Sequence, residues 1–326
     1  MEASARETYG KTLIELGGQN PDIVVLDADL AKSTMTAFFA KEFPDRFFDC
    51  GVAEQNMIGI AAGLAASGKT VFASTFAVFA PGRCFDQCRM CIAQQNLNVK
   101  VVTTHGGVTV GEDGSSHHAV EDLALACSLP GFRVVVPADA VETAQAIRVA
   151  ADTYGPFYIR LSRPKAPIVY PSDYQFRLGK AATLREGKDV TVVAAGLMVA
   201  LALEAARRLA EDGVDCRVLS MSTWKPLDEE AIVKAARETG AIVTVEEHLR
   251  RNGLGSAVAQ VAAETAPVPM AFIAIDDVYS KSGKPDELLR QRGLTSDNIA
   301  TAAAALLSKK ERRPQDPRTD APRGAI

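Results

Sequence analysis

The stretch RFFDCGVAEQNMIGIAAGLAASG, residues 46–68, predicts a short strand followed directly by a helix, with Glu54 at the joint. After its first turn the helix consists almost wholly of small and apolar residues, which is typical of a tightly packed segment. A buried strand leading into a helix is the repeating unit of layered α/β proteins. The stretch therefore predicts an α/β fold. It also raises the question of why a carboxylate heads a segment suited to burial.

The same alternation of strand and helix extends over residues 3–165, which we predict to form a first α/β domain. Short apolar runs rich in β-branched residues predict buried strands at 21–30, 69–75, 97–105, 132–139 and 157–162. Helical segments separate them, at 5–18, 33–43, 54–68, 84–96, 120–131 and 140–155. Helices that alternate with buried strands predict a largely parallel sheet.

A second α/β domain is predicted over residues 187–308, after a linker at 166–186 that is punctuated by Pro and Gly. Its strands are expected at 189–196, 215–221, 240–248 and 269–276. Its helices are expected at 198–213, 227–240, 254–266 and 296–309. Residues 309–326 are charged, contain Pro and lack apolar periodicity, so this tail is expected to be disordered.

The composition is that of a globular protein and excludes several classes of partner. The chain has 326 residues, of which 47% are hydrophobic and 23% charged, with a net charge of −4. This balance gives no indication of binding to nucleic acid or to an anionic membrane. No apolar run reaches the roughly 18 residues of a membrane helix, and the first ten residues have no signal-peptide core. We therefore expect a cytoplasmic protein.

The six cysteines do not form a pattern typical of disulfides, because the chain is long and not rich in Cys. Cys84, Cys88 and Cys91 share one face of a predicted helix, which raises the possibility of a metal site. A fourth ligand is not apparent, and the spacing differs from that of zinc knuckles. Burial of three small side chains on a packed helix is the better interpretation, and no metal ligand is predicted in this chain.

Five stretches, taken together, resemble transketolases, the first being VAEQNMIGIAAGLAASG at residues 52–68. The others are FASTFAVFAPGRCFDQCRM, THGGVTVGEDGSSHHAVEDLA, YIRLSRP, and VEEHLRRNGLGSAV with SGKPDELL. Their order and spacing match the family over residues 3 to 307. The resemblance implies a thiamine-diphosphate pyrimidine-binding domain followed by a transketolase C-terminal domain.

In this family a carboxylate forms a hydrogen bond with the pyrimidine ring of the cofactor, and this bond activates the cofactor. A pocket of low dielectric strengthens the bond. The resemblance implies this catalytic role for Glu54, although a solvated Glu favoured by the helix dipole is the alternative from position alone. Phe76 and Phe79 match the aromatic residues lining the pyrimidine pocket, with Phe79 stacking on the ring. A third aromatic residue of the family is replaced by Gly82. Asp29 matches a residue near the thiamine.

Substrate binding is expected in the Gly-rich loop THGGVTVGEDGSSHH, residues 104–118, which ends with His117 and His118. It is not a P-loop, because the Gly-Lys-Ser/Thr ending is absent. By resemblance, Asp113 binds a sugar hydroxyl, and His117 contacts hydroxyls near the reacting carbonyl and can transfer protons. His118 has no counterpart in the family and is expected at the surface.

Arg6, Ser33, His105 and Arg163 match the four transketolase positions that bind the substrate's phosphate. An Arg guanidinium offers a fork of donors that fits phosphate oxygens. Arg163 follows a predicted strand, so it can reach a site at the carboxyl edge of a sheet. A sulfonate or a second acidic group would suit the same cluster.

The transketolase domain that binds the diphosphate through a metal is not found in this sequence: its Gly-Asp-Gly signature followed by Asn is missing, and GEDG at 111–114 belongs to the substrate loop. The resemblance therefore implies the C-terminal subunit of a split transketolase, active only with an N-terminal subunit that contributes the thiamine diphosphate site and Mg²⁺ or Ca²⁺. Gly59, Ala62 and Gly63 are expected to let helices of two copies approach closely, so two copies of each subunit are predicted.

Three other interpretations remain open from the sequence. One is a different thiamine enzyme, namely a 2-oxoacid dehydrogenase β subunit or a deoxyxylulose-phosphate synthase. Another is a non-catalytic scaffold or regulatory homodimer with the same fold. The third is an α/β binding module without chemistry, which explains none of the five stretches.

Overall fold

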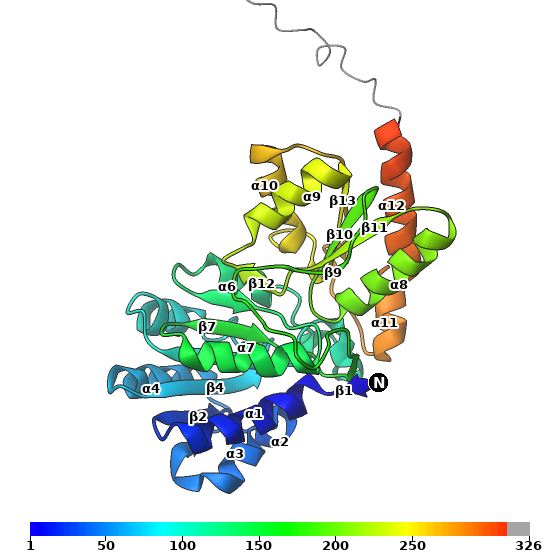
Figure 1. Ribbon diagram of the computed structural model, residues 1–326. Helices are drawn as coiled ribbons and strands as arrows, with labels where there is room; N and C mark the ends of the chain where they lie inside the picture. Colours follow the sequence, from blue (N-terminus) through cyan, green and yellow to red (C-terminus); the bar gives the residue numbers. More distant parts are fainter. Residues whose placement is uncertain (312–326) are drawn as a thin grey trace, which may run out of the picture.

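Two largely parallel sheets organise the chain, one in each half, and the two halves are stacked along the long axis (Figure 1). The structure, a computed structural model, describes residues 1–311, and for residues 309–311 it describes the backbone alone. The expected α/β architecture with two sheets is confirmed.

The larger sheet has seven strands in the order β12-β6-β7-β5-β4-β2-β3. All neighbours are parallel except β12, which pairs antiparallel with β6 at one edge. The strands are β2 (Ile23–Asp27), β3 (Phe47–Asp49), β4 (Thr70–Phe76), β5 (Val99–Thr104), β6 (Arg133–Val135), β7 (Phe157–Arg160) and β12 (Thr223–Lys225).

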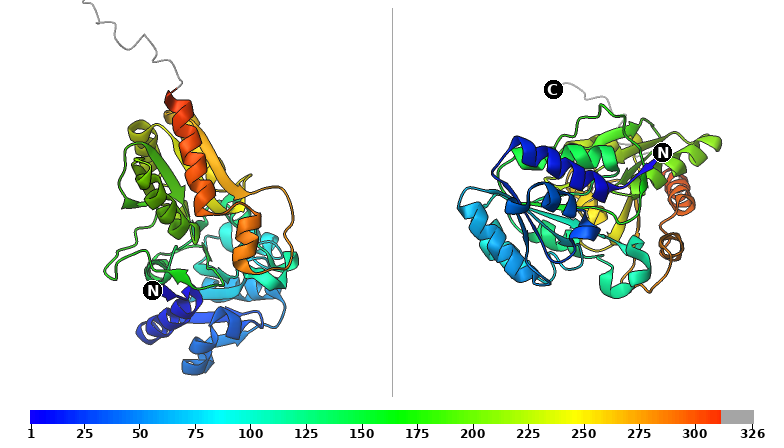
Figure 2. Two further views of the ribbon diagram at one scale, coloured as in Figure 1. Left: turned by 90° about the vertical axis from the view of Figure 1, so that its right-hand side faces the viewer. Right: turned by 90° about the horizontal axis from the view of Figure 1, so that it is seen from below.

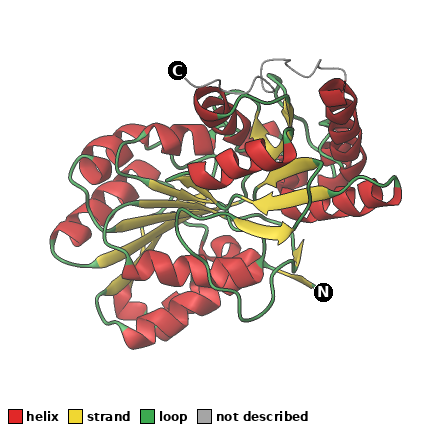
Figure 3. Ribbon diagram, turned by 45° about the horizontal axis from the view of Figure 1, so that its top comes forward, coloured by secondary structure: helices red, strands yellow, loops and turns green. Residues whose placement is uncertain are grey.

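Helices cover both faces of this sheet (Figure 3). Successive strand residues face opposite sides, so Val25 packs with one layer of helices and Leu26 with the other. The first layer contains α1 (Ala5–Gln19), α3 (Ala37–Glu42) and α7 (Ala140–Asp152). The second contains α4 (Glu54–Ala66), the π-helical turn η2 (Cys88–Ala93) and α6 (Asp122–Ser128). The short helices α2 (Ala31–Thr34), η1 (Pro44–Arg46) and α5 (Phe85–Gln87) complete the connections.

The smaller sheet has five strands in the order β14-β13-β10-β11-β9, with β9 antiparallel to its neighbour. The strands are β9 (Ala182–Arg185), β10 (Val190–Ala194), β11 (Cys216–Ser220), β13 (Ile242–Leu249) and β14 (Met270–Ile275). One face packs on α8 (Met198–Glu211), α11 (Pro285–Gln291) and α12 (Ser296–Glu311). The other packs on α9 (Glu229–Thr239) and α10 (Leu254–Thr265), whose core is continuous with that of the first half. Figure 2 shows the two halves from the side and from below.

The helix boundaries have local causes. The Ser4 hydroxyl accepts a hydrogen bond from the backbone N–H of Glu7 at the start of α1, and Asp139 and Asp228 cap α7 and α9 in the same way. Gly240, with φ of 65°, ends α9 in the left-handed conformation that glycine adopts without steric cost.

Several elements differ from those expected. β9 lies inside the segment 166–186 predicted as a linker, and β8 (Ala166–Pro167) in the same segment pairs with β1 (Glu2–Ala3). The helix expected at 33–43 is interrupted by Met35, whose φ is 69°. α12 continues through Glu311, past residue 308. The rest of the tail expected to be disordered, 312–326, lies outside the described residues. The domain boundaries at 165, 187 and 308 remain predictions.

Candidate active site

The predicted site residues gather at the carboxyl edge of the larger sheet. β7, β5, β4 and β2 are consecutive neighbours in that sheet. Phe76 ends β4 and His105 follows β5 directly, while Ser33 and Arg163 lie in the segments after β2 and β7. Carboxyl ends of parallel strands meet at one edge, where ligands of open α/β sheets bind. Five separate parts of the sequence therefore converge, because α1 adds Arg6 to the same edge.

Glu54 starts α4 and is almost wholly buried, with 1% of its side chain exposed. The Nη1 atom of Arg83 donates to both carboxylate oxygens, at 2.9 Å and 2.8 Å. The same guanidinium lies over the ring of Phe79, 4.4 Å from its centroid. A flat group with N–H donors thus already fits between the Glu54 carboxylate and the Phe79 ring. This is the shape and donor chemistry that an aminopyrimidine ring also presents, so the residues fit the cofactor that the sequence implied.

Aromatic rings form one wall of the site. The Phe76 ring stacks on the imidazole of His105 with centroids 3.8 Å apart, and on Phe79 at 5.9 Å. His117 approaches Phe79 edge-on at 5.5 Å. The two predicted pocket aromatics are therefore in contact with two predicted substrate residues. Gly82, at the position of the third aromatic residue, has no ring to contribute. The guanidinium of the neighbouring Arg83 lies over the ring of Phe79 instead.

His105 is held in an unusual backbone conformation and is kept neutral. Its φ of 61° lies in the left-handed region, which is uncommon for a residue other than glycine. Burial, followed by the positive charges of Arg6 and Arg163, lowers the pKa of His105 to about 3. A neutral imidazole donates or accepts a hydrogen bond without adding to the positive charge of the cluster.

The predicted anion-binding residues lie together. Arg6 donates to the backbone carbonyl of Ser33 at 2.5 Å and to that of Arg163 at 3.2 Å. Arg163 in turn donates to the backbone carbonyl of Val110 and to the carboxylate of Glu112. The guanidinium groups are thus anchored mainly by carbonyl oxygens. This arrangement concentrates positive charge. Burial lowers the pKa of Arg6, and the nearby charge of Arg163 lowers it further.

The loop after β2 depends on Asp27, a buried residue that the sequence analysis did not single out. Its carboxylate accepts hydrogen bonds from the backbone N–H of Leu30 (2.6 Å) and from the hydroxyls of Thr34 (2.7 Å) and Thr36 (2.8 Å). Burial raises the pKa of Asp27 to about 6, while these bonds oppose the shift. The loop that these bonds fix carries Asp29 and Ser33. Asp29 is exposed, and its backbone N–H donates to Asp49.

Residues 105–118, here called the substrate loop, contain two 3₁₀ turns, η3 (Val108–Asp113) and η4 (Ser115–His117). Asp113 is exposed and His117 half-buried. His118 is buried, and its Nε2 lies 3.0 Å from the carbonyl oxygen of Gly111. The expectation that His118 lies at the surface was wrong, because this side chain is buried beneath the loop and contacts the loop backbone at Gly111.

Two of the three small residues expected at the outer face of α4 lie there. Gly59 and Gly63 are exposed, and a Cβ atom at either position would meet only open space. Ala62 instead packs into the core at 7% exposure. A close helix contact with a second chain would therefore involve the two glycines and not Ala62, because Ala62 faces the sheet.

The three helical cysteines lie at or near the core, with Cys84 and Cys88 buried and Cys91 half-buried. Within residues 1–311 we find no group of three or more His, Cys, Asp or Glu side chains that could hold a metal ion. None of the helices in this part of the chain is long and apolar enough to span a membrane.

Comparison with known proteins gives matches along nearly the whole chain. Residues 1–168 match the model of the transketolase pyrimidine binding domain, and residues 179–299 match that of the transketolase C-terminal domain. A protein of Methanocaldococcus jannaschii named for the C-terminal section of transketolase is 48% identical, over 90% of this chain and 93% of its own. The subunit SqwH of 6-deoxy-6-sulfo-D-fructose transketolase from a Clostridium species is 41% identical, over 94% and 96%.

A solved structure described as a split-gene transketolase, inactive β4 tetramer, is also similar. Its TM-score is 0.88 at 51% identity, with 94% of this chain and 98% of that chain covered. These matches agree with the two α/β domains of the structure. The chain therefore belongs to the transketolase family and comprises the pyrimidine-binding and C-terminal domains of that family.

Proposed function

We propose that this chain is the C-terminal subunit of a split transketolase, which transfers a two-carbon ketol unit from a ketose donor to an aldose acceptor. The observation that carries the proposal is the buried Glu54 carboxylate, which faces the Phe79 ring and already binds a flat cation there. Thiamine diphosphate, when bound, supplies the nucleophilic carbon that accepts the two-carbon unit.

Glu54, Phe76 and Phe79 would hold the pyrimidine end of the cofactor, with Asp29 nearby. Glu54 offers a hydrogen-bond acceptor in a site from which water is largely excluded, where such a bond is strongest. Arg83 occupies both the carboxylate and the ring face in the free chain, so it has to move when the cofactor binds. Its side chain is 46% exposed, which leaves room for that movement.

The substrate would lie beside the aromatic wall. His117 is placed to exchange a proton with a hydroxyl near the reacting carbonyl, and Asp113 to bind a sugar hydroxyl. Arg6, Ser33, His105 and Arg163 would bind a terminal anion of the sugar, because two guanidinium groups and a neutral imidazole provide donors for it. A phosphate is the proposed anion, and a sulfonate is the second candidate, since one similar protein is named for a sulfonated sugar.

The site needs a second kind of chain. We propose an N-terminal subunit that binds the diphosphate through Mg²⁺ or Ca²⁺, and an assembly with two copies of each subunit. The proposal is supported by the solved relative, which is described as an inactive tetramer of its β chain. The exposed glycines of α4 offer a surface for self-association. All six cysteines are free, which agrees with a cytoplasmic location.

The donor substrate tests this proposal against the other thiamine enzymes. The chain is combined with an N-terminal transketolase subunit, thiamine diphosphate and Mg²⁺, and ketose phosphates are compared with pyruvate as donors. We expect turnover with ketose phosphates only. Turnover with pyruvate alone would instead identify a dehydrogenase or synthase subunit, and the absence of turnover with every donor would favour a scaffold.

A further inference from the structure

Glu247, near the end of β13 in the C-terminal half, reaches across to the substrate loop of the first half. Its Oε1 atom accepts the backbone N–H of Thr109 at 2.7 Å, and its Oε2 atom lies 3.3 Å from the Thr109 hydroxyl. Both residues are buried. A backbone amide bound by a buried carboxylate is held more firmly than one bound by a neutral acceptor.

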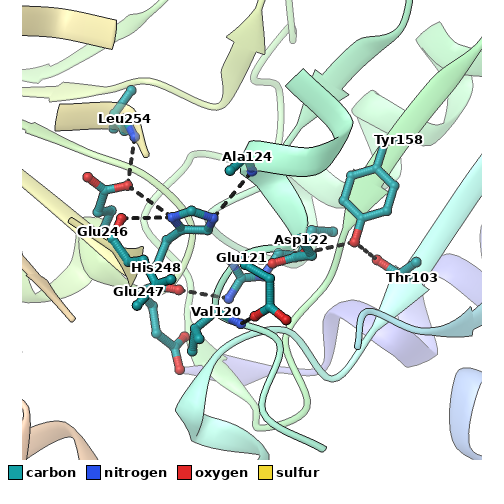
Figure 4. Close-up of polar contacts among 12 residues, drawn as sticks. Thr103, Val120, Glu121, Asp122, Ala124, Tyr158, Glu246, Glu247, His248 and Leu254 are labelled. Carbon is teal, nitrogen blue, oxygen red and sulfur yellow. Dashed lines mark hydrogen bonds and ion pairs between the residues drawn. The ribbon is translucent and has the colours of Figure 1, made fainter. Parts of the chain in front are cut away.

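The shape of the loop fits this contact closely. A Cβ atom at Gly107 would lie 2.1 Å from the Cδ of Glu247, and one at Gly106 would lie 1.9 Å from the Nε of Arg160. The loop backbone is therefore packed between a carboxylate of one half and a guanidinium of the other. Arg160 also donates to the backbone carbonyl of Glu247 at 2.9 Å and pairs with Asp122 at 3.5 Å, which joins the two groups into one network. Figure 4 shows Glu247 and Asp122 among the polar contacts of this region.

A second contact of the C-terminal half lies further along the loop. The Ser282 hydroxyl donates to the backbone carbonyl of Glu112, and α11 packs against η3. The loop starts at His105, whose left-handed backbone persists only if its surroundings hold it. His117 lies near the other end of the loop, so the positions of His105 and His117 both depend on the conformation of the segment between them.

We infer that Glu247 is a positioning residue for ketol transfer, through which the C-terminal domain holds the substrate loop in its working conformation. The inference rests on the proposed function, and it gives the C-terminal domain a task in catalysis although the site residues named above all lie in the first half of the chain. Glu247 acts through Thr109 and does not itself touch the substrate.

Two variants of similar size separate the hydrogen bond from packing. Glu247→Gln keeps an acceptor for the Thr109 amide, whereas Glu247→Met removes it. Ser222→Ala is the matched control, because the Ser222 hydroxyl donates to the buried carboxylate of Glu142 at 2.7 Å, also between the two halves but away from the loop. Thr109→Val, which removes only the weaker hydroxyl contact, provides a milder second test if Glu247→Met folds poorly.

Hydrogen exchange of the isolated chain measures the contact without cofactor or partner. We expect peptides containing the Thr109 amide to exchange about 10- to 150-fold faster in Glu247→Met than in the wild type. Glu247→Gln should stay within tenfold of the wild type, and Ser222→Ala should not change this segment. Unchanged exchange in Glu247→Met would show that Glu247 does not hold the loop.

Kinetics of the assembled pair measure the consequence. A misplacement of about 1 Å can lower the rate on the order of 100-fold. We therefore expect kcat/KM of Glu247→Met to fall by that order, with a raised KM for the donor. Glu247→Gln should remain largely active. A loss of folded enzyme alone would lower kcat and leave KM unchanged. Fast exchange with wild-type kinetics, or an equal loss in Ser222→Ala, would overturn the inference. An inactive wild-type pair would instead refute the proposed function, while the exchange result still decides whether Glu247 holds the loop.

Discussion

The pair formed by Glu54 and Arg83 gives a prediction that depends on this structure alone. Among the described residues, Arg83 is the one side chain that hydrogen-bonds the Glu54 carboxylate, and that carboxylate is 1% exposed. Replacing Arg83 with Met therefore leaves a buried charge without a partner. Breaking a fully buried pair costs roughly 3–5 kcal/mol. Arg83 is 46% exposed, and solvent weakens its interaction, so we expect a loss of about 1–2 kcal/mol in the free energy of unfolding.

A double-mutant cycle isolates the cause. Glu54→Gln removes the charge, so Arg83→Met should cost much less in the Glu54→Gln background than in the wild type. The measurement is urea unfolding of the isolated chain at pH 7.5, followed by circular dichroism, for the wild type, both single variants and the double variant. Equal costs of Arg83→Met in the two backgrounds would refute the reasoning, since the loss would then come from packing on Phe79 and not from an unpaired carboxylate.

Three further predictions concern the assembled enzyme and the anion cluster. Glu54→Gln should lower kcat of the reconstituted pair at least 100-fold with little change in assembly measured by sedimentation, because an amide cannot replace the carboxylate; near-normal turnover would remove Glu54 from its catalytic role. Arg163→Ala should raise KM for phosphorylated donors by about 10- to 150-fold and leave KM for hydroxypyruvate almost unchanged. Equal increases for both donors would mean that Arg163 does not bind the anion. His105→Asn should reduce the pH dependence of the free energy of unfolding. The pKa of His105 is about 3 in the folded state and near 6.5 in the unfolded state, so below pH 6.5 the unfolded state binds a proton that the folded state does not. The wild type should therefore lose about 2 kcal/mol of stability between pH 7.5 and pH 5. Urea melts at pH 7.5 and pH 5 measure this, and an unchanged pH dependence in the variant would contradict it.

The fold could be predicted from sequence where an element is long and periodic. β2, β4 and β5 are rich in apolar and β-branched residues and are buried on both faces, so their pattern alone indicates them. β9 and β12 are short edge strands with polar residues, and both form because a neighbouring strand is present to pair with them. A pattern within one segment does not contain that information.

The site could be predicted in part, for the same reason. The motifs indicated Glu54 and the residues around it, and the structure brings these residues to one edge of one sheet. The pairing of Arg83 with Glu54 spans 29 positions in the sequence, and the contact between Thr109 and Glu247 spans 138. Neither has a local signal. Asp27 had a detectable one, since an Asp side chain commonly accepts a hydrogen bond from a nearby backbone N–H, as Asp27 does from Leu30 three positions further on.

The most direct test of the split-enzyme account is ketol transfer measured with each subunit alone and with both together. The assay uses thiamine diphosphate, Mg²⁺, a ketose phosphate donor and an aldose phosphate acceptor, with the Glu54→Gln chain as the matched control. The account predicts transfer by the wild-type pair and none by either subunit alone or by the pair that contains Glu54→Gln. Transfer by this chain in the absence of the N-terminal subunit would contradict it.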